Sequence, residues 1–197
     1  MDLSTTPIRT IEPLLIERLR LVFTKQKFSL DRVPSVLTIK EFERIVRQTP
    51  FIGLAFLSVA PSRNSGRQMQ AVMRWRLFLV VTATRDLRTR FSGDAQDVGL
   101  DPMTDAAAAA LQGWSIDRIG DVAVTGIEAV YADGWADDAT VVNQVDFEVS
   151  YSASSSMLRL ADPGDFKRLA VSWPTAGAPD LTRSEIINVG GDDGADV

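Results

Sequence analysis

The sequence predicts an α/β (α+β) domain in which a mostly antiparallel sheet packs against two or three helices. Three observations predict this fold class: helical spacing of apolar residues near the start, five consecutive alanines in the middle, and alternating apolar and polar residues in the second half. The chain has 197 residues, which allows one domain and a tail at roughly 100–200 residues per domain. We expect the domain at residues 1–152 and an irregular extension at residues 153–197.

The N-terminal segment predicts a long amphipathic helix over residues 7–24. Thr6 places a hydroxyl at the N-cap, and Pro7 stands at the first helical position, where a missing N–H costs nothing. Such a helix lies flat on a sheet or against another subunit. Five apolar residues share its inner face at helical spacing: Ile8, Ile11, Leu15, Leu19 and Val22.

A short helix and a pair of strands are expected next. Thr38 and Glu41 have the spacing of a capping box and predict the helix. The apolar run at residues 51–59 predicts a strand buried on both faces. The alternation at residues 73–81 predicts a second strand. Residues 60–70 are rich in turn formers, so they predict a loop at the tip of a mobile arm.

The second half of the domain predicts one helix and a hairpin. Residues 85–100 are charged and read as irregular. Asp101, followed by a proline, predicts the start of an alanine-rich helix over residues 103–112. Two strands at residues 122–132 and 140–152 follow, most simply as an antiparallel pair. The second of these strands has one apolar face for the core and one polar face for water or a partner.

Charge is distributed unevenly along the chain. Residues 1–90 carry 16 Lys/Arg and 7 Asp/Glu, a balance of +9, and residues 91–197 carry 5 and 19, a balance of −14. If the two halves interleave in space, the result is two ordinary surfaces. If they do not, the basic face of one copy can meet the acidic face of the next, which would steer assembly.

Cysteine and histidine are both absent. Disulfides, thiolate nucleophiles, Cys/His zinc sites and imidazole bases are therefore excluded. The sequence also has no phosphate-binding loop, dinucleotide fingerprint or nucleophile elbow, so we expect no catalytic, cofactor-binding or metal-binding residues. Three acidic clusters are interpreted as solvated surface turns: Asp94 and Asp97; Asp133, Asp137 and Asp138; and Asp192, Asp193 and Asp196.

Two sets of charged residues are candidate sites. The first is an interface arm formed by Arg63 and Arg67, which could contact protein carboxylates, phosphate or only water. The second is a charged sheet face, where two arginines could pair with two carboxylates across the sheet or form a lumen or inter-subunit surface. Its members are Arg74, Arg76, Asp146 and Glu148. Trp75 and Trp114 are expected to be core aromatics.

The order of these elements resembles the small tail proteins of Mu-like bacteriophages and prophages, in the tail-terminator (tail-completion) group. Three segments carry the resemblance: residues 11–19 (Ile-Glu-Pro-Leu-Leu-Ile-Glu-Arg-Leu), residues 106–114 and residues 147–151. It extends over about residues 7–152, and none of its motifs is catalytic.

The resemblance implies a virion structural protein rather than an enzyme, located in the tail or neck and assembled in the host cytoplasm. Copies would form a ring of six at the head-proximal end of the tail tube, end tube polymerisation and join the tail to the head connector. The partners implied are the tail-tube protein below and a connector or neck protein above. DNA would pass through the lumen without sequence-specific binding, repelled by carboxylates such as Asp146 and Glu148.

The C-terminal extension departs from the compact pattern of that group. Its short apolar patches are suited to docking on a neighbouring subunit or collar protein, and its acidic end is expected to be disordered.

Two alternatives remain open. One is another virion component of related fold, a tail-tube or head-completion (neck) subunit. The other is a carboxylate-based, metal-dependent enzyme that uses Asp133, Asp137 and Asp138. No apolar stretch approaches the ~20 residues that span a bilayer, and charged residues occupy the start where a signal peptide would be apolar, so we expect neither a membrane segment nor a leader.

Overall fold

A computed structural model describes residues 6–64, 68–82, 86–95, 97–130, 139–154, 168–175 and 178–188. The chain divides into two compact units. The larger comprises Ser4–Met157, and the smaller comprises Leu158–Val197 with Met1–Leu3.

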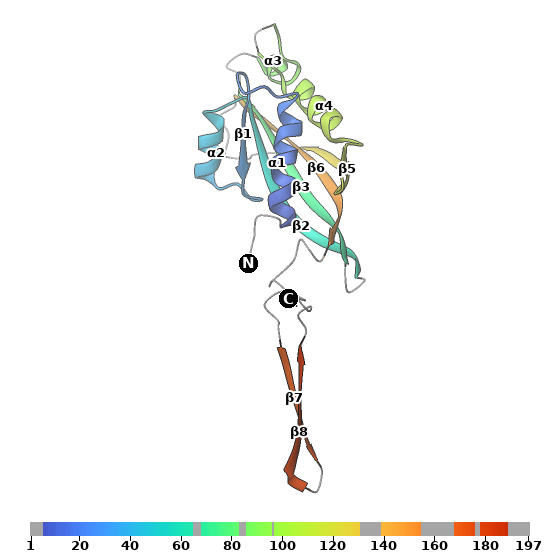
Figure 1. Ribbon diagram of the computed structural model, residues 1–197. Helices are drawn as coiled ribbons and strands as arrows, with labels where there is room; N and C mark the ends of the chain where they lie inside the picture. The colour runs from blue at the N-terminus through green and yellow to red at the C-terminus, as the bar shows by residue number, and fades with distance from the viewer. Residues whose placement is uncertain are drawn as a thin grey trace, which may run out of the picture. The chain divides into compact units, whose positions relative to one another are not determined.

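The larger unit is built on a mixed, mostly antiparallel sheet of six strands, which confirms the predicted fold class. The strand order is β1-β2-β3-β6-β5-β4, and only the β1–β2 pair is parallel. Figure 1 shows the strands curling across the unit. The strands are β1 (Ser29–Val33), β2 (Phe51–Asn64), β3 (Gln68–Thr82), β4 (Ser115–Ile116), β5 (Gly120–Ala129) and β6 (Thr140–Ser154).

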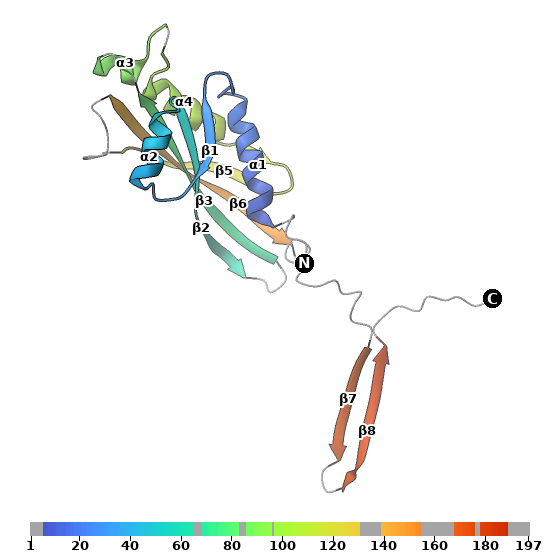
Figure 2. The same cartoon turned by 90° about the vertical axis from the view of Figure 1, so that its left-hand side faces the viewer.

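Helices cover the two faces of the sheet unequally. Helices α1 (Pro7–Arg20) and α4 (Leu100–Leu111) bury their apolar sides with Trp75 and Leu77 of β3 on one face. Helix α2 (Ile39–Val46) connects the parallel pair β1 and β2 and, on the other face, covers that pair and the adjoining ends of β3 and β6 (Figures 1 and 2). The rest of this second face, over β3, β6 and β5, is not covered by any described helix, so we call it the open face.

The local signals for the helices are mostly confirmed. Helix α2 has both hydrogen bonds of its capping box, between Thr38 and Glu41. Helix α1 starts at Pro7 as predicted, but its Thr6 N-cap makes no capping hydrogen bond with its side chain. Helix α1 also ends at Arg20, earlier than predicted, and Leu21 is 73% exposed beyond it.

The alanine-rich helix begins slightly earlier than the sequence suggests. Gly99 is the N-cap of α4, and Asp101 lies in the first turn, where its negative charge faces the positive end of the helix dipole. The helix ends at Leu111, and Gly113 has a positive φ of 70° just after the C-cap. Glycine is favoured there because it adopts this backbone conformation without a steric penalty.

Several local predictions are wrong because tertiary pairing outweighs them. The loop predicted at residues 60–70 is largely strand, since β2 continues to Asn64 and β3 begins at Gln68. β3 is paired on both sides along its length, which stabilises extended backbone even among turn-forming residues. Helix α3 (Leu87–Ser92), with Asp86 as its N-cap, forms where irregular structure was expected, and the short strands β1 and β4 were not predicted.

The smaller unit contains a hairpin of β7 (Arg168–Thr175) and β8 (Ala178–Asn188), labelled in Figure 1. The sequence indicated only isolated apolar patches there. In register, Leu169 is opposite Ile187 and Ala170 is opposite Ile186. A two-stranded hairpin alone is marginally stable in water, because it has no second layer on which to bury an apolar face.

Candidate functional site

The candidate charged face lies at the centre of the open face, where β3 runs beside β6. Arg74 is directly opposite Glu148 in the β-ladder, and Arg76 is directly opposite Asp146. Arg76 binds Asp146 with two hydrogen bonds, from Nε to Oδ1 at 2.6 Å and from Nη2 to Oδ2 at 2.8 Å. Arg74 makes a single bond, from Nε to Oε1 of Glu148 at 2.8 Å. The predicted cross-strand pairing is therefore confirmed.

The two ion pairs differ in burial. The side chains of Arg76 and Asp146 are 25% and 30% exposed, and those of Arg74 and Glu148 are 55% and 31% exposed. The pKa of Arg76 is raised, first by its hydrogen bond to Asp146 and then by the negative charges of Asp146 and Glu128, against the opposing effect of burial. Arg76 is therefore held firmly in its charged form.

Two β-bulges flank the ion pairs. In β2 the ladder skips between Phe56 and Ser58, so that Leu57 is the extra residue, and in β5 it skips between Val124 and Gly126, so that Thr125 is the extra residue. A bulge bends its strand and increases the local twist. The bulges thus lie on either side of the β3–β6 pair, at the level of the ion pairs.

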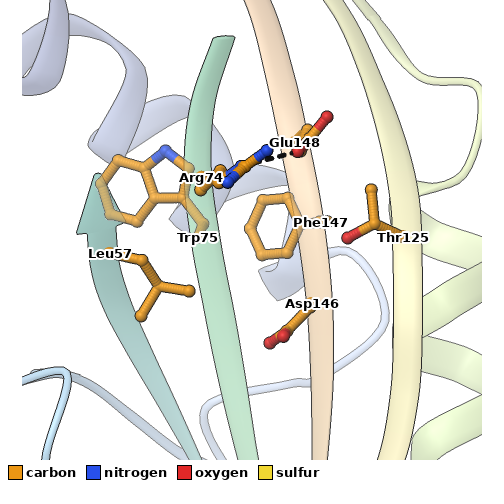
Figure 3. Close-up of a pocket in the computed structure, with 7 residues that line it drawn as sticks. All are labelled: Leu57, Arg74, Trp75, Thr125, Asp146, Phe147 and Glu148. Atoms are coloured by element: carbon orange, nitrogen blue, oxygen red, sulfur yellow. Dashed lines mark hydrogen bonds and ion pairs between the residues drawn. The ribbon is translucent and has the colours of Figure 1, made fainter. Parts of the chain in front are cut away.

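A hollow of about 360 Å³ lies between the two bulges. Figure 3 shows Arg74 reaching from β3 to Glu148 on β6, with Leu57 and Thr125 on the flanking strands. The charged groups of this hollow are mutually paired, so none of them is an evident acid, base or nucleophile. Its chemistry suits contact with a polar surface better than catalysis. The lining residues are Leu57, Arg74, Trp75, Thr125, Asp146, Phe147 and Glu148.

Trp75 is a fully buried core residue, as predicted. Its ring meets the edge of Phe56 with centroids 5.4 Å apart, and the Arg32 guanidinium carbon lies 4.6 Å from the Trp75 ring centroid. Trp114 is partly buried at the edge of the same core, with the guanidinium carbon of Arg18 5.4 Å from its ring centroid. Both tryptophans therefore serve the packing of α1 and β1 on the sheet.

The candidate interface arm is described only in part. Arg63 lies in β2 with its backbone opposite Gln70, and Arg67 lies outside the described residues. The acidic clusters at residues 133–138 and 192–196 also lie outside them. Asp94 and Asp97 close a turn, in which the backbone N–H of Asp97 donates to Oδ1 of Asp94 at 2.8 Å.

Sequence reasoning missed three residues around the charged face. Leu57 and Thr125 reach the hollow only because each is the extra residue of a bulge. Glu128 accepts a hydrogen bond from Gln144 at 2.9 Å and adds to the negative field at Arg76. The glycine at position 126, isolated inside a strand, was the available signal for the β5 bulge.

One expectation for this face needs correction. Asp146 and Glu148 were expected to repel DNA as exposed carboxylates, but each is paired with an arginine. The four charges of the face sum to zero, so this repulsion is largely cancelled. The same face of β6 is not polar along its whole length, because Val142 is buried against the core under α2.

No family model matches the chain, and no curated protein matches it. Within the described ranges, no group of three or more carboxylate side chains could hold a metal ion. No helix in the part of the chain that the structure describes is long and apolar enough to cross a membrane.

Proposed function

We propose that the protein is a structural subunit of a phage virion, a tail terminator that forms a ring at the head-proximal end of the tail tube. In this role it ends tube polymerisation and offers a surface to the head connector or neck protein. The observation that carries the proposal is the fold: a mostly antiparallel sheet with α1 and α4 on one face and an open face opposite.

The open face supports the proposal through its charge. Four charged side chains near its centre are paired, so the surface is hydrated and close to neutral. If this face lines the lumen of a ring, DNA meets dipoles and paired charges, which neither bind phosphate strongly nor block its passage. No hydrogen-bond pattern for reading bases is needed for that role.

The test is copy number in purified particles of the encoding genome, measured by quantitative mass spectrometry against the major tube protein. One ring's worth of copies supports a terminator, provided that electron microscopy places the density at the top of the tube. Hundreds of copies identify a tube subunit instead, and one ring located elsewhere in the neck identifies a head-completion protein. Absence from particles refutes a virion role.

A further inference from the structure

The sheet keeps the strands of the two oppositely charged halves of the chain apart. Strands β1, β2 and β3 occupy one side of the sheet, and β6, β5 and β4 occupy the other. The halves therefore do not interleave as strands: within the sheet they adjoin between β3 and β6, and above it α1 packs beside α4. The charge asymmetry of the sequence becomes an asymmetry between the two edges of the sheet.

The β1–α2 edge is basic. Residues 24–48, which include β1 and α2, contain six Lys/Arg and three Asp/Glu, a balance of +3. Lys40 and Arg44 of α2 and Arg47 at its C-cap follow one another at helical spacing and are exposed. Arg44 pairs with Asp31 at 3.3 Å, and both side chains are about half exposed.

The opposite edge is acidic. Residues 93–129, which include α4, β4 and β5, contain one Lys/Arg and seven Asp/Glu, a balance of −6. Asp101 and Asp105 are exposed one turn apart on α4, and Asp117 lies 93% exposed just after β4. Its ion pair with Arg118, at 3.6 Å, is equally exposed and so compensates little of the field.

Both edges also expose apolar side chains. Val36, which precedes the N-cap of α2, is 76% exposed, and Ile39, the first residue of α2, is 59% exposed. Ile127, in β5, is 48% exposed. An apolar contact framed by charges is the usual composition of an interface.

The β1 edge is closed to strand addition. The backbone N–H of Ser29 points toward β2 and donates to the carbonyl oxygen of Pro50. Because these directions alternate along a strand, the backbone carbonyls of residues 28 and 30 point away from β2. The Arg20 guanidinium binds the outward carbonyls of Phe28, at 2.9 Å, and Leu30, at 3.4 Å. Covering an edge in this way prevents it from pairing with another strand. A partner at this edge must therefore be bound through side chains.

We propose that the chain associates with a second copy of itself head to tail, the basic β1–α2 edge of one copy meeting the acidic α4–β5 edge of the next. The two edges carry opposite charge, so the β1–α2 edge of one copy attracts the α4–β5 edge of another copy and repels the other copy's β1–α2 edge. A contact between two different surfaces is heterologous, and heterologous contacts close into rings when the rotation per copy allows it. The inference rests on the proposed function only for this closure; the pairing of the edges does not depend on it.

The test uses the purified full chain and exchanges the charge of each edge. Variant one carries Lys40→Glu and Arg47→Glu, and variant two carries Asp105→Lys and Asp117→Lys. All four side chains are exposed, so folding is expected to be retained. Arg9→Glu, at an exposed position near the start of α1, is the control for a change in net charge.

Association is measured by sedimentation velocity over a concentration series at about 50 mM and 500 mM salt. We expect wild type and Arg9→Glu to associate at low salt, and each edge variant to associate at least tenfold more weakly. An equimolar mixture of the two edge variants should regain association, because each then offers the charge that the other lacks. Circular dichroism of each variant checks that it is folded.

Three results would overturn the inference: a wild-type chain that stays monomeric at low salt, edge variants that associate like wild type, or a mixture that is not restored although both variants are folded. The outcome is separate from that of the particle measurement. A chain absent from particles can still pair through these edges, and a chain present as one ring can use other surfaces.

Discussion

The two ion pairs of the open face allow a comparison within one strand pair. Arg76–Asp146 and Arg74–Glu148 are two residues apart on the same strands and share one neighbourhood. They differ in geometry: the first has two hydrogen bonds and is about 70% buried, and the second has one bond and a largely exposed arginine. A double-mutant cycle to alanine on each pair isolates its coupling energy.

The coupling energies should differ by about threefold. Exposed ion pairs contribute ~0.2–1 kcal/mol, so we expect about 0.5 kcal/mol for Arg74–Glu148. Charge-assisted bidentate pairs are roughly twice as strong per bond and have two bonds, so we expect about 1.5 kcal/mol for Arg76–Asp146. At ~2–4 °C per kcal/mol, the second coupling corresponds to about 3–6 °C in Tm.

The measurement is urea unfolding of the wild type, four single variants and two double variants, followed by tryptophan fluorescence and by circular dichroism. Repeating it in about 1 M salt, where the Debye length is ~3 Å, should remove most of the weaker coupling and less of the stronger one. Equal couplings for the two pairs, or a stronger coupling for Arg74–Glu148, would refute the assignment of strength to burial and bidentate geometry.

Three further predictions follow from local structure. Gly120→Ala should destabilise the larger unit by about 2 kcal/mol, because a Cβ there would overlap the carbonyl of Ser150. Gly126→Ala has open space around its Cβ and should change the stability by no more than about 0.5 kcal/mol. Thermal unfolding compares the two variants, and similar losses of stability would count against the packing argument. Thr38→Ala should lower the free energy of unfolding by about 1 kcal/mol because it removes the cap of α2, and Thr38→Ser should keep most of that stability. Urea unfolding checks both variants, and a Thr38→Ala variant as stable as wild type would argue against the cap. The pKa of Asp86 is lowered, mainly because the backbone N–H of Thr89 donates to its carboxylate. The contribution of Asp86 to the stability of α3 is therefore present above pH ~4 and is lost as the pH falls through the lowered folded-state pKa. An NMR titration that gave an ordinary pKa for the Asp86 carboxyl would contradict this.

Much of the fold follows from local patterns. The capping box at Thr38, the proline at position 7 and the alternation along residues 140–152 each placed an element of the right type. The pairing of Arg74 with Glu148 also followed from the expected alternation of two neighbouring strands, because charged residues on the same face of adjacent strands come opposite each other. These features depend on neighbours in sequence or in register.

Other features depend on contacts that no local pattern carries. Strand β1 is short and polar in sequence, and it forms because β2 pairs with it and Arg20 covers its outer edge. The ends of β2 and β3 are extended because β6 pairs with β3 as far as Ser154, although the residues there favour turns. The hollow requires bulges in two strands that are not adjacent in sequence, so Leu57 and Thr125 could not be grouped beforehand.

The position of the ion pairs explains why the charge asymmetry survives folding. β3 belongs to the basic half and β6 to the acidic half, and they are the strands at which the halves adjoin. There the excess charge cancels, since Arg74 and Arg76 face Glu148 and Asp146. Away from this junction, residues 24–48 at one edge of the sheet carry a balance of +3, and residues 93–129 toward the other edge carry −6. Reversing both ion pairs with Arg74→Glu, Arg76→Asp, Asp146→Arg and Glu148→Arg should therefore preserve the fold and leave edge-to-edge association unchanged, because the junction remains neutral and the edges keep their charges. Circular dichroism checks the fold and sedimentation velocity checks the association; a folded variant that associates more weakly than wild type would show that the junction itself takes part in the contact.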